Sequence, residues 1–227
     1  FYGTKMFLKK FLKLKENKLY YEYRYTKFKN KFKILDQFNL NYKSIILDFG
    51  SNVGDVSKYL YEKYKSNIYS YEPNIHAYNI QKKRFAYNKK IHVFNKAIDV
   101  ESTKKSIYFH KNSLKGGDVE YSHASSLDAN KANVSKENSQ IVNTISVSEI
   151  LKQFNQIDLV KIDIEGYEYK ILPVLIDNRH KIKKIIAELH GSPYGKKTYK
   201  NYKEKYFNLN KNLQELNLVK DWFIEWK

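Results

Sequence analysis

The 227-residue sequence contains no cysteine. Disulfide bonds, thiolate nucleophiles and zinc–thiolate sites are therefore excluded, and a protein without disulfides suits a reducing compartment, so we expect it in the cytoplasm. Long apolar runs are also missing, since none approaches the roughly 20 residues that a membrane-spanning helix needs. Nor does the sequence contain the apolar core of a signal peptide. These absences indicate a globular protein that does not cross a membrane.

Acidic residues are few compared with basic ones. The chain has 42 Lys and Arg against 24 Asp and Glu, which gives a formal net charge of +18. Such an excess can mark a surface that binds a polyanion. However, the lysines are spread along the whole chain together with Asn, Ile and Tyr, as translation of an AT-rich genome would produce. Composition bias and an anionic partner therefore both remain open, and we favour composition bias.

Residues 1–43 form the most basic segment, with twelve Lys or Arg against three acidic residues. Their pattern is helical, and several apolar side chains fall roughly on one face: Phe7, Leu8, Phe11, Leu12 and Leu19. We expect this segment to be an N-terminal helical extension that caps a domain comprising residues 44–227. The alternative is that the basic helix lies on an acidic membrane surface, which would place the protein at the inner face of the membrane.

From residue 44 onward, short apolar runs alternate with helical segments, which predicts an α/β fold with a mostly parallel sheet and helices on both faces. The expected strands are residues 45–48, 68–71, 91–95, 157–163 and 185–190, with shorter strands at 106–109 and 141–144 and a last one within 219–226. The expected helices are residues 56–64, 75–87, 146–154, 167–177 and 200–216. Residues 111–140 are polar and without a clear period, so we expect a long functional or disordered loop there.

The segment LDFGSNVGDVS, residues 47–57, carries the first functional motif. Asp48 ends a strand, Gly50 and Gly54 permit a tight turn, and a helix follows. A glycine turn in this place lets a ligand approach backbone N–H groups, because no Cβ stands in the way. The G-x-x-x-G spacing differs from that of dinucleotide sites, which disfavours an NAD-dependent oxidoreductase. The missing Lys-Ser/Thr pair excludes a nucleoside-triphosphate P-loop.

Glu72 ends the second expected strand, 24 residues after Asp48. A carboxylate there can accept hydrogen bonds from both hydroxyls of a ribose. Together with the glycine turn, Glu72 therefore predicts a cofactor that contains a nucleoside. The alternative is two ordinary strand-to-helix turns with solvated acids.

Five segments, in this order, resemble the motifs of FkbM-type S-adenosylmethionine-dependent methyltransferases. They are ILDFGSNVGDVSKYL, YSYEPN, FNKAID, IDLVKIDIEGYEYKIL and IIAELH, and KIDIEGYE at residues 161–168 is the most specific part. The resemblance covers roughly residues 44–190. It implies a Rossmann-like class I methyltransferase fold with a seven-stranded sheet. It also implies methyl transfer to an oxygen, often a sugar hydroxyl of a glycan, glycolipid or related metabolite.

The resemblance also assigns cofactor-binding residues. Those expected around the methionine part of S-adenosylmethionine are Asp48, Gly50, Ser51, Asn52 and Gly54. Glu72 would hold the ribose with Pro73 and Asn74 beside it, and Ala97 and Ile98 would contact the adenine, with Asp99 near its exocyclic amine. Such sheets usually end in an antiparallel hairpin, but here only one convincing strand follows the last helix.

Methylation of a sugar hydroxyl needs a general base or a metal ion to manage the proton. Asp163 ends the fourth strand, and we expect it to lie closest to the chemistry. His190 is expected to act as base or acceptor ligand, and Glu165 to assist. The alternatives are helix capping for Asp163 and Glu165 and a structural role for His190. Their oxygen and imidazole atoms suit Mg²⁺, but no metal-binding motif supports it, so metal dependence stays open.

Two serines in HASSL, Ser125 and Ser126, are candidates to contact the cofactor carboxylate or the acceptor. A sugar or glycan is the expected acceptor, and DNA is not expected as a partner. An RNA ribose methyltransferase is the nearest alternative, since the chain is basic but has neither a prolyl base-methylation motif nor a cysteine. The other is a non-catalytic polyanion-binding module on a methyltransferase fold, and the intact motif residues argue against it.

Overall fold

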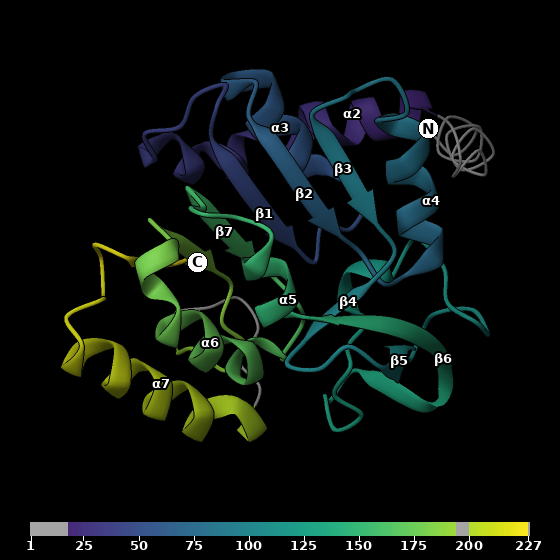
Figure 1. Ribbon diagram of the computed structural model, residues 1–227. Coiled ribbons are helices and arrows are strands. Elements are labelled where there is room, and N and C mark those ends of the chain that lie inside the picture. The colour runs from purple at the N-terminus through teal and green to yellow at the C-terminus, as the bar shows by residue number, and fades with distance from the viewer. Residues whose placement is uncertain (1–17, 194–199, 227) are drawn as a thin grey trace.

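A six-stranded, fully parallel sheet forms the centre of the protein in a computed structural model that describes residues 18–193 and 200–226 (Figure 1). The strand order is β3-β2-β1-β7-β8-β9. The strands are β1 (Ile45–Phe49), β2 (Asn67–Tyr71), β3 (Ile91–Phe94), β7 (Leu159–Ile162), β8 (Ile185–Ala187) and β9 (Phe223–Glu225). The expected α/β fold with a mostly parallel sheet is confirmed.

Helices cover both faces of this sheet. They are α3 (Asp55–Tyr64), α4 (Ile75–Arg84), α5 (Val147–Lys152), α6 (Glu168–Asp177) and α7 (Lys203–Glu215), with short 3₁₀ turns η3 (Arg179–Lys181) and η4 (Lys200–Tyr202). Successive side chains of a strand point to opposite faces. Accordingly, Ile46 of β1 packs in a cluster with Leu60 of α3, whereas Leu47 packs in a separate cluster with Leu172 of α6. This two-sided burial explains the nearly continuous apolar runs of the central strands.

The described part of the N-terminal extension packs against the sheet domain. It consists of α2 (Lys18–Phe28) and the 3₁₀ helix η1 (Lys29–Gln37). Leu35 of η1 is buried in the same cluster as Leu60, and Tyr21 of α2 is buried against Val53. The apolar residues expected on one face from Phe7 to Leu12 lie outside the described residues. The division at residue 43 and the membrane contact stay predictions. In the described part of the chain, no helix is both long and apolar enough to span a bilayer.

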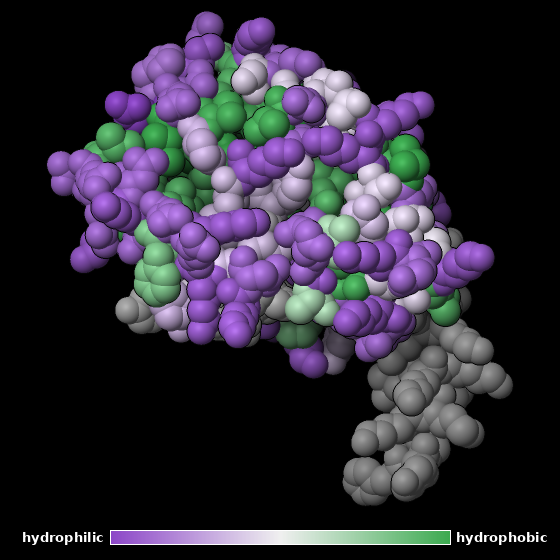
Figure 2. Space-filling view, turned by 90° about the horizontal axis from the view of Figure 1, so that it is seen from below, coloured by the Kyte–Doolittle hydropathy of each residue, from purple (hydrophilic) through white to green (hydrophobic). Residues whose placement is uncertain are grey.

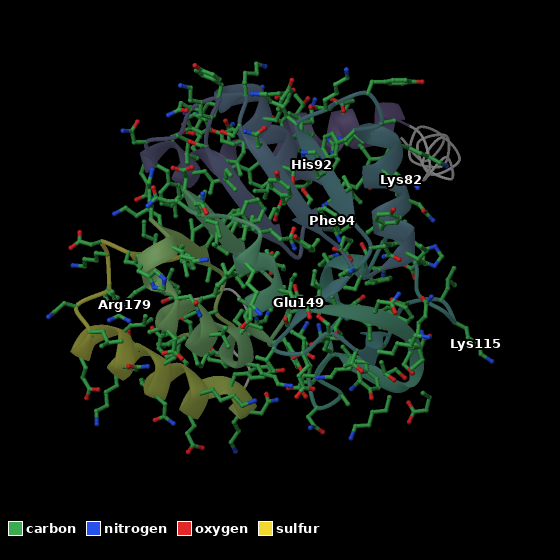
Figure 3. The ribbon with its side chains drawn as sticks, viewed as in Figure 1. Lys82, His92, Phe94, Lys115, Glu149 and Arg179 are labelled. Atoms are coloured by element: carbon green, nitrogen blue, oxygen red, sulfur yellow. The ribbon has the colours of Figure 1, made fainter. Side chains whose placement is uncertain are left out.

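A second, three-stranded sheet lies on the side toward which β1, β2 and β3 run (Figure 1). Its strands, in the order β4-β6-β5, are β4 (Ala97–Asp99), β5 (Lys104–His110) and β6 (Val134–Ser146), and β4 pairs with β6 in parallel. The short 3₁₀ turn η2 (Ser122–Ala124) lies between β5 and β6. Figure 3 shows Lys115 projecting from the loop between β5 and η2. A loop was expected over residues 111–140, but β6 begins at Val134, so this expectation is wrong after residue 133.

Several other expected boundaries need correction. The strands expected at 157–163 and 185–190 end earlier, at Ile162 and Ala187. These two residues lie side by side with Glu225, and the three are the last paired residues of β7, β8 and β9. Glu188 and His190 therefore lie beyond the end of β8. The resemblance implied seven strands, but the main sheet has six within the described residues, and β9 is parallel to β8.

Aromatic stacking fastens the edge strand β3 to β2. The rings of His92 and Tyr69 stack with centroids 4.8 Å apart, and those of Phe94 and Tyr71 stack at 4.9 Å. Figure 3 shows His92 and Phe94 on β3. His92 therefore has a packing role, which agrees with the absence of a ligand pattern around it in the sequence.

Candidate active site

A pocket lies at the carboxyl ends of β1, β2 and β7. It encloses about 590 Å³ of space, including its open mouth. The main sheet contributes Gly50, Asn52, Tyr71, Glu72, Pro73, Asp163, Ile164 and Glu165, and the segment after β5 contributes Ser122, His123, Ser125, Ser126 and Leu127. Ala97, Ile98, Ile107 and Tyr167 complete the lining. The carboxyl ends of parallel strands are where ligands bind in open α/β sheets.

Gly50 is required here for a different reason from the one expected. It adopts a left-handed φ of 75°, and an added Cβ would lie 1.9 Å from the carbonyl oxygen of Asp163. The missing side chain thus lets the ends of β1 and β7 approach each other closely. Gly54 likewise makes room for the ring of Phe85, which would lie 2.5 Å from a Cβ added at residue 54. Both glycines therefore have a role in the close packing of neighbouring segments.

Glu72 joins the ends of β2 and β1. Its Oε2 accepts a hydrogen bond from the backbone N–H of Asn52 at 2.8 Å, and its Oε1 accepts one from the N–H of Asn74 at 2.8 Å. Burial raises the pKa of Glu72 to about 7, although these two N–H groups favour the ionised form. Each carboxylate oxygen still has a second lone pair for a ligand hydroxyl.

The pocket brings together only part of the expected cofactor set. The expected residues that line it are Gly50, Asn52, Glu72, Pro73, Ala97 and Ile98. The others are not among the lining residues: Asp48, Ser51, Gly54 and Asn74. Asp48 accepts a hydrogen bond from Ser57 at 2.6 Å and pairs with the buried Lys161 at 3.1 Å. The Asn74 side chain accepts hydrogen bonds at the start of α4, so it is a helix cap.

Asp99, which was expected near the adenine, is not among the lining residues of the pocket. Its carboxylate is fully buried, pairs with Lys105, and lies 3.4 Å from Lys170 and 3.3 Å from the hydroxyl of Tyr167. Burial would raise its pKa, but Lys105 more than offsets this and lowers it. Asp99 therefore fixes Tyr167 at the edge of the pocket.

Three polar atoms of the pocket lining have no hydrogen-bond partner in the described part of the chain. They are Asn52 Oδ1, Ser125 Oγ and Asp163 Oδ1. Buried polar atoms are normally hydrogen-bonded, so such a group indicates a missing partner. Ser126 differs from Ser125, because its hydroxyl donates to the backbone carbonyl of Glu165 at 2.8 Å. Of the two candidate serines, Ser125 is thus the one available to a ligand.

Asp163 faces the pocket directly after β7. Burial raises its pKa to about 7, against the opposing effect of the nearby Lys161 ammonium. Lys161 itself is buried and donates to the Gly50 carbonyl at 2.8 Å. A carboxyl group with a pKa near neutrality is suited to general-base catalysis.

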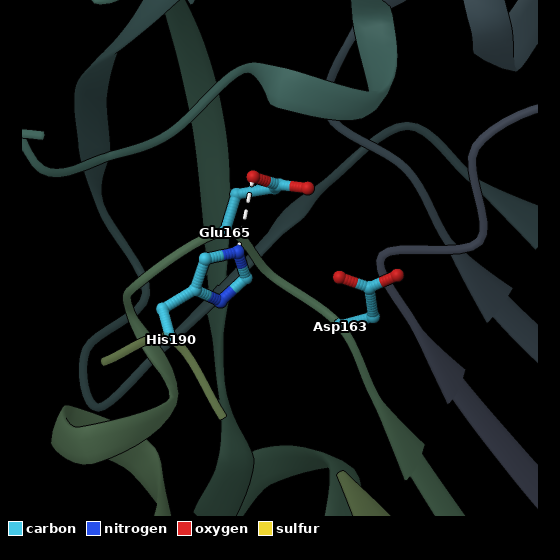
Figure 4. A group of neighbouring side chains, drawn as sticks. All are labelled: Asp163, Glu165 and His190. Carbon is cyan, nitrogen blue, oxygen red and sulfur yellow. Dashed lines mark hydrogen bonds and ion pairs between the residues drawn. The ribbon is translucent and has the colours of Figure 1, made fainter. Parts of the chain in front are cut away.

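Glu165 and His190 lie next to Asp163 (Figure 4). His190 Nε2 lies 3.2 Å from Glu165 Oε2, and its Nδ1 lies 3.1 Å from Glu168 Oε1. Burial alone would lower the pKa of His190, but Glu168 and Glu165 more than offset this and raise it to about 10. His190 is absent from the pocket lining. The imidazole is thus a cation between two carboxylates, which favours positioning of Glu165 over the predicted role as base.

Lys131 is a functional candidate that the sequence did not indicate. Its side chain is fully buried, its ammonium pairs with Glu165 Oε2, and it donates to the carbonyl of Ala124 at 3.1 Å. It thereby ties the segment that carries Ser125 to the end of β7. A lone lysine in a polar stretch is usually exposed, so no sequence signal marked it.

Helix capping does not account for Asp163 or Glu165. The turn before α6 is capped by Glu168, whose Oε1 accepts from the N–H of Gly166 at 3.0 Å and of Ile164 at 3.2 Å. Glu165 itself has a left-handed φ of 59°, an unusual conformation for a residue other than glycine. Its carboxylate is therefore directed toward the pocket and the two cations instead of toward the helix.

The candidate metal ligands do converge. One ligand atom each from Asp163, Glu165 and His190 lie within 4.8 Å of one another. However, Glu165 Oε2 is already shared by Lys131 and His190. Both nitrogens of His190 lie within hydrogen-bond distance of a carboxylate, Nε2 of Glu165 and Nδ1 of Glu168. The cluster as arranged is a hydrogen-bonded network rather than a set of free ligands.

The parallel sheet and the pocket at the ends of β1, β2 and β7 fit the fold of Rossmann-like methyltransferases. The family model described as the methyltransferase FkbM domain matches residues 48–218. The chain therefore belongs to the FkbM methyltransferase family. No curated protein matches it. The matched segment contains all the pocket residues named above. Methyl transfer is the activity of this class.

Proposed function

We propose that this protein is an S-adenosylmethionine-dependent O-methyltransferase that acts on a sugar hydroxyl of a glycan, glycolipid or related metabolite. The observation that supports it best is the combination, in one pocket, of Glu72 with three unpaired polar atoms. A nucleoside with a charged amino-acid tail offers matching groups. The sugar acceptor is supported by the family resemblance of the KIDIEGYE segment.

The residues present fit the cofactor. Glu72 can accept hydrogen bonds from the ribose hydroxyls, and Ala97, Ile98 and Ile107 offer apolar contact for the adenine. Asn52 Oδ1 can accept from the amino group of the methionine part, and the hydroxyl of Ser125 can donate to its carboxylate. When bound, S-adenosylmethionine supplies a methyl group that its sulfonium already makes electrophilic.

The protein's own part in the reaction is to orient the acceptor and remove its proton. Asp163 follows β7 at the pocket, and its pKa of about 7 suits a general base, so it accepts the proton of the hydroxyl. Glu72 also has a pKa of about 7, but its carboxylate is assigned to the ribose. Glu165 is fixed beside it by Lys131 and His190 and assists in orienting the acceptor. Orientation of the reacting oxygen contributes a large part of such catalysis.

Two measurements on the full chain test this function. Calorimetry with S-adenosylhomocysteine is expected to show one binding site per chain, which Glu72→Ala weakens. Transfer of a labelled methyl group is then measured with a panel of sugars, nucleotide sugars and glycolipids, with RNA alongside. Labelling of carbohydrate acceptors supports the proposal. Labelling of RNA alone would support the ribose methyltransferase, and a failure to bind the cofactor product would support the non-catalytic alternative.

A further inference from the structure

A second, larger pocket adjoins the first one. It encloses about 1250 Å³ of space, including its open side, and lies between α6 and α7. Its lining comprises Leu127, Asp128, Gly166, Tyr167, Tyr169, Lys170, Pro173, Lys205, Asn208, Leu209 and Asn212, and we call it the α6–α7 groove. Leu127 and Tyr167 line both pockets. The two pockets therefore adjoin at Leu127 and Tyr167.

Tyr167 is a fixed wall between the two pockets. Its hydroxyl donates to Asp99 at 3.3 Å and accepts from the Lys170 ammonium at 2.7 Å. Asp99 is in turn held by Lys105. Because Asp99 and Lys170 both bond to its hydroxyl, the ring of Tyr167 is held in one orientation. It offers its apolar face to a ligand that spans the pocket and the groove.

The groove carries polar groups that the protein itself does not use. Asn208 and Asn212 are exposed, one turn apart on α7, and their side-chain amides bond to no other described residue. Lys205 precedes them on the same face and has no carboxylate partner in the described chain. Its ammonium lies 5.2 Å from the centre of the Tyr202 ring. Asp128 is the acidic lining residue, and the hydroxyl of Tyr202 donates to it at 2.8 Å.

These groups match an acidic carbohydrate. Amides at i and i+4 can each both donate to and accept from sugar hydroxyls. Tyrosine rings suit the apolar faces of pyranoses, and the free ammonium of Lys205 suits a carboxylate or phosphate. The molecular face that includes α7 is mainly hydrophilic, with small interrupted apolar areas (Figure 2), so an apolar partner is disfavoured.

We propose that the α6–α7 groove is the subsite for an acidic sugar residue that neighbours the methylated sugar in an oligosaccharide acceptor. This inference rests on the proposed function. It adds the substrate class, an anionic oligosaccharide, and its specificity determinants: Lys205 for the acidic group, and Asn208 and Asn212 for the hydroxyls.

The test uses the full chain saturated with S-adenosylhomocysteine and two tetrasaccharides of equal length. One alternates glucuronate with N-acetylglucosamine, and the other contains N-acetylglucosamine alone. Calorimetry or saturation-transfer NMR is expected to show tighter binding of the acidic tetrasaccharide, by about threefold to fivefold, as for one exposed ion pair. Lys205→Gln should remove this preference. Asn208→Ala should weaken both sugars by about fivefold, which corresponds to one lost hydrogen bond.

The net charge of +18 demands a matched control. Lys203 is an exposed lysine of the same helix that does not line the groove, so Lys203→Gln changes the charge equally. It should leave the preference for the acidic sugar intact. Equal effects of the two lysine variants, equal binding of both sugars, or binding of neither would overturn the proposal. Tighter binding of a hexaribonucleotide that depends on Lys205 would overturn it in favour of RNA.

Failure of this inference is distinguishable from failure of the proposed function. Binding of S-adenosylhomocysteine is measured separately in each variant, and thermal unfolding shows whether the variant is folded. If the cofactor product binds normally while neither sugar binds, the groove assignment fails and the methyltransferase proposal stands. If the cofactor product does not bind to the unaltered protein, the proposed function itself fails.

Discussion

The ammonium of Lys131 contacts the carboxylate of Glu165 inside the protein, although the two residues lie 34 positions apart in the chain. Glu165 also contacts His190, so one buried carboxylate is shared by two cations. Breaking a buried ion pair from one side leaves the other charge without compensation. This contact therefore gives the first prediction.

Replacement of Lys131 by methionine is expected to destabilise the fold by about 3 to 5 kcal/mol, because it leaves Glu165 with one cationic partner fewer. Denaturant unfolding measures this loss. Lys136→Met is the matched control, since Lys136 is exposed. The double variant Lys131→Met with Glu165→Gln should recover part of the loss, because the unpaired charge is then gone. A loss no greater than that of the control would show that the pair contributes little.

Glu72→Ala is expected to weaken binding of S-adenosylhomocysteine by about 1 to 3 kcal/mol, through loss of two ribose hydrogen bonds. It also leaves the N–H groups of Asn52 and Asn74 without their acceptor, so Glu72→Gln, which keeps one acceptor, is made alongside. Since ribose hydroxyls donate to the ionised carboxylate, affinity should rise as the pH passes upward through about 7. Unchanged affinity in both variants would remove Glu72 from the site.

The raised pKa of His190 predicts how the stability of the fold depends on pH. Its pKa is raised in the folded protein to about 10, against about 6.5 for an unfolded chain. Between these values the folded state binds more protons than the unfolded state, so the contribution to stability is complete below pH 6.5 and is lost as the pH rises toward 10. The melting temperature of the unaltered protein should thus fall more between pH 7 and pH 9.5 than that of His190→Gln. Parallel curves for the two proteins would mean that His190 is neutral in the fold.

Turnover is expected to survive removal of divalent metal ions. Glu165 Oε2 already contacts Lys131 and His190, and the other nitrogen of His190 contacts Glu168. Methyl transfer is measured after dialysis against EDTA, and again with Mg²⁺ restored. Loss of activity that Mg²⁺ restores would show that Asp163, Glu165 and His190 rearrange into a metal site. Binding of S-adenosylhomocysteine in both samples separates this outcome from unfolding.

The positions of the main strands along the chain could be predicted from the sequence, because buried parallel strands such as Ile45–Phe49 are short apolar runs followed by turn residues. The strand that begins at Val134 could not, since its first half, VSKENSQ, is polar and has no alternating pattern. The position of Asp163 in the pocket followed from its place after a strand. The roles of Lys131 and Glu168 depend on contacts between distant segments, and these contacts leave no periodic signal in the sequence.

Asp163 is expected to control the pH dependence of methyl transfer. A general base acts in its ionised form, so the rate should rise about tenfold per pH unit below the pKa of about 7 and level off above it. Asp163→Asn should lower turnover by about two orders of magnitude while cofactor affinity changes only severalfold. Glu188→Gln is the comparison. Glu188 does not line the pocket, but its charge raises the pKa of Asp163, so this variant should keep its turnover while the profile moves to lower pH. Equal loss of affinity and turnover in Asp163→Asn, or a pH profile that persists in it, would assign the proton transfer to another group.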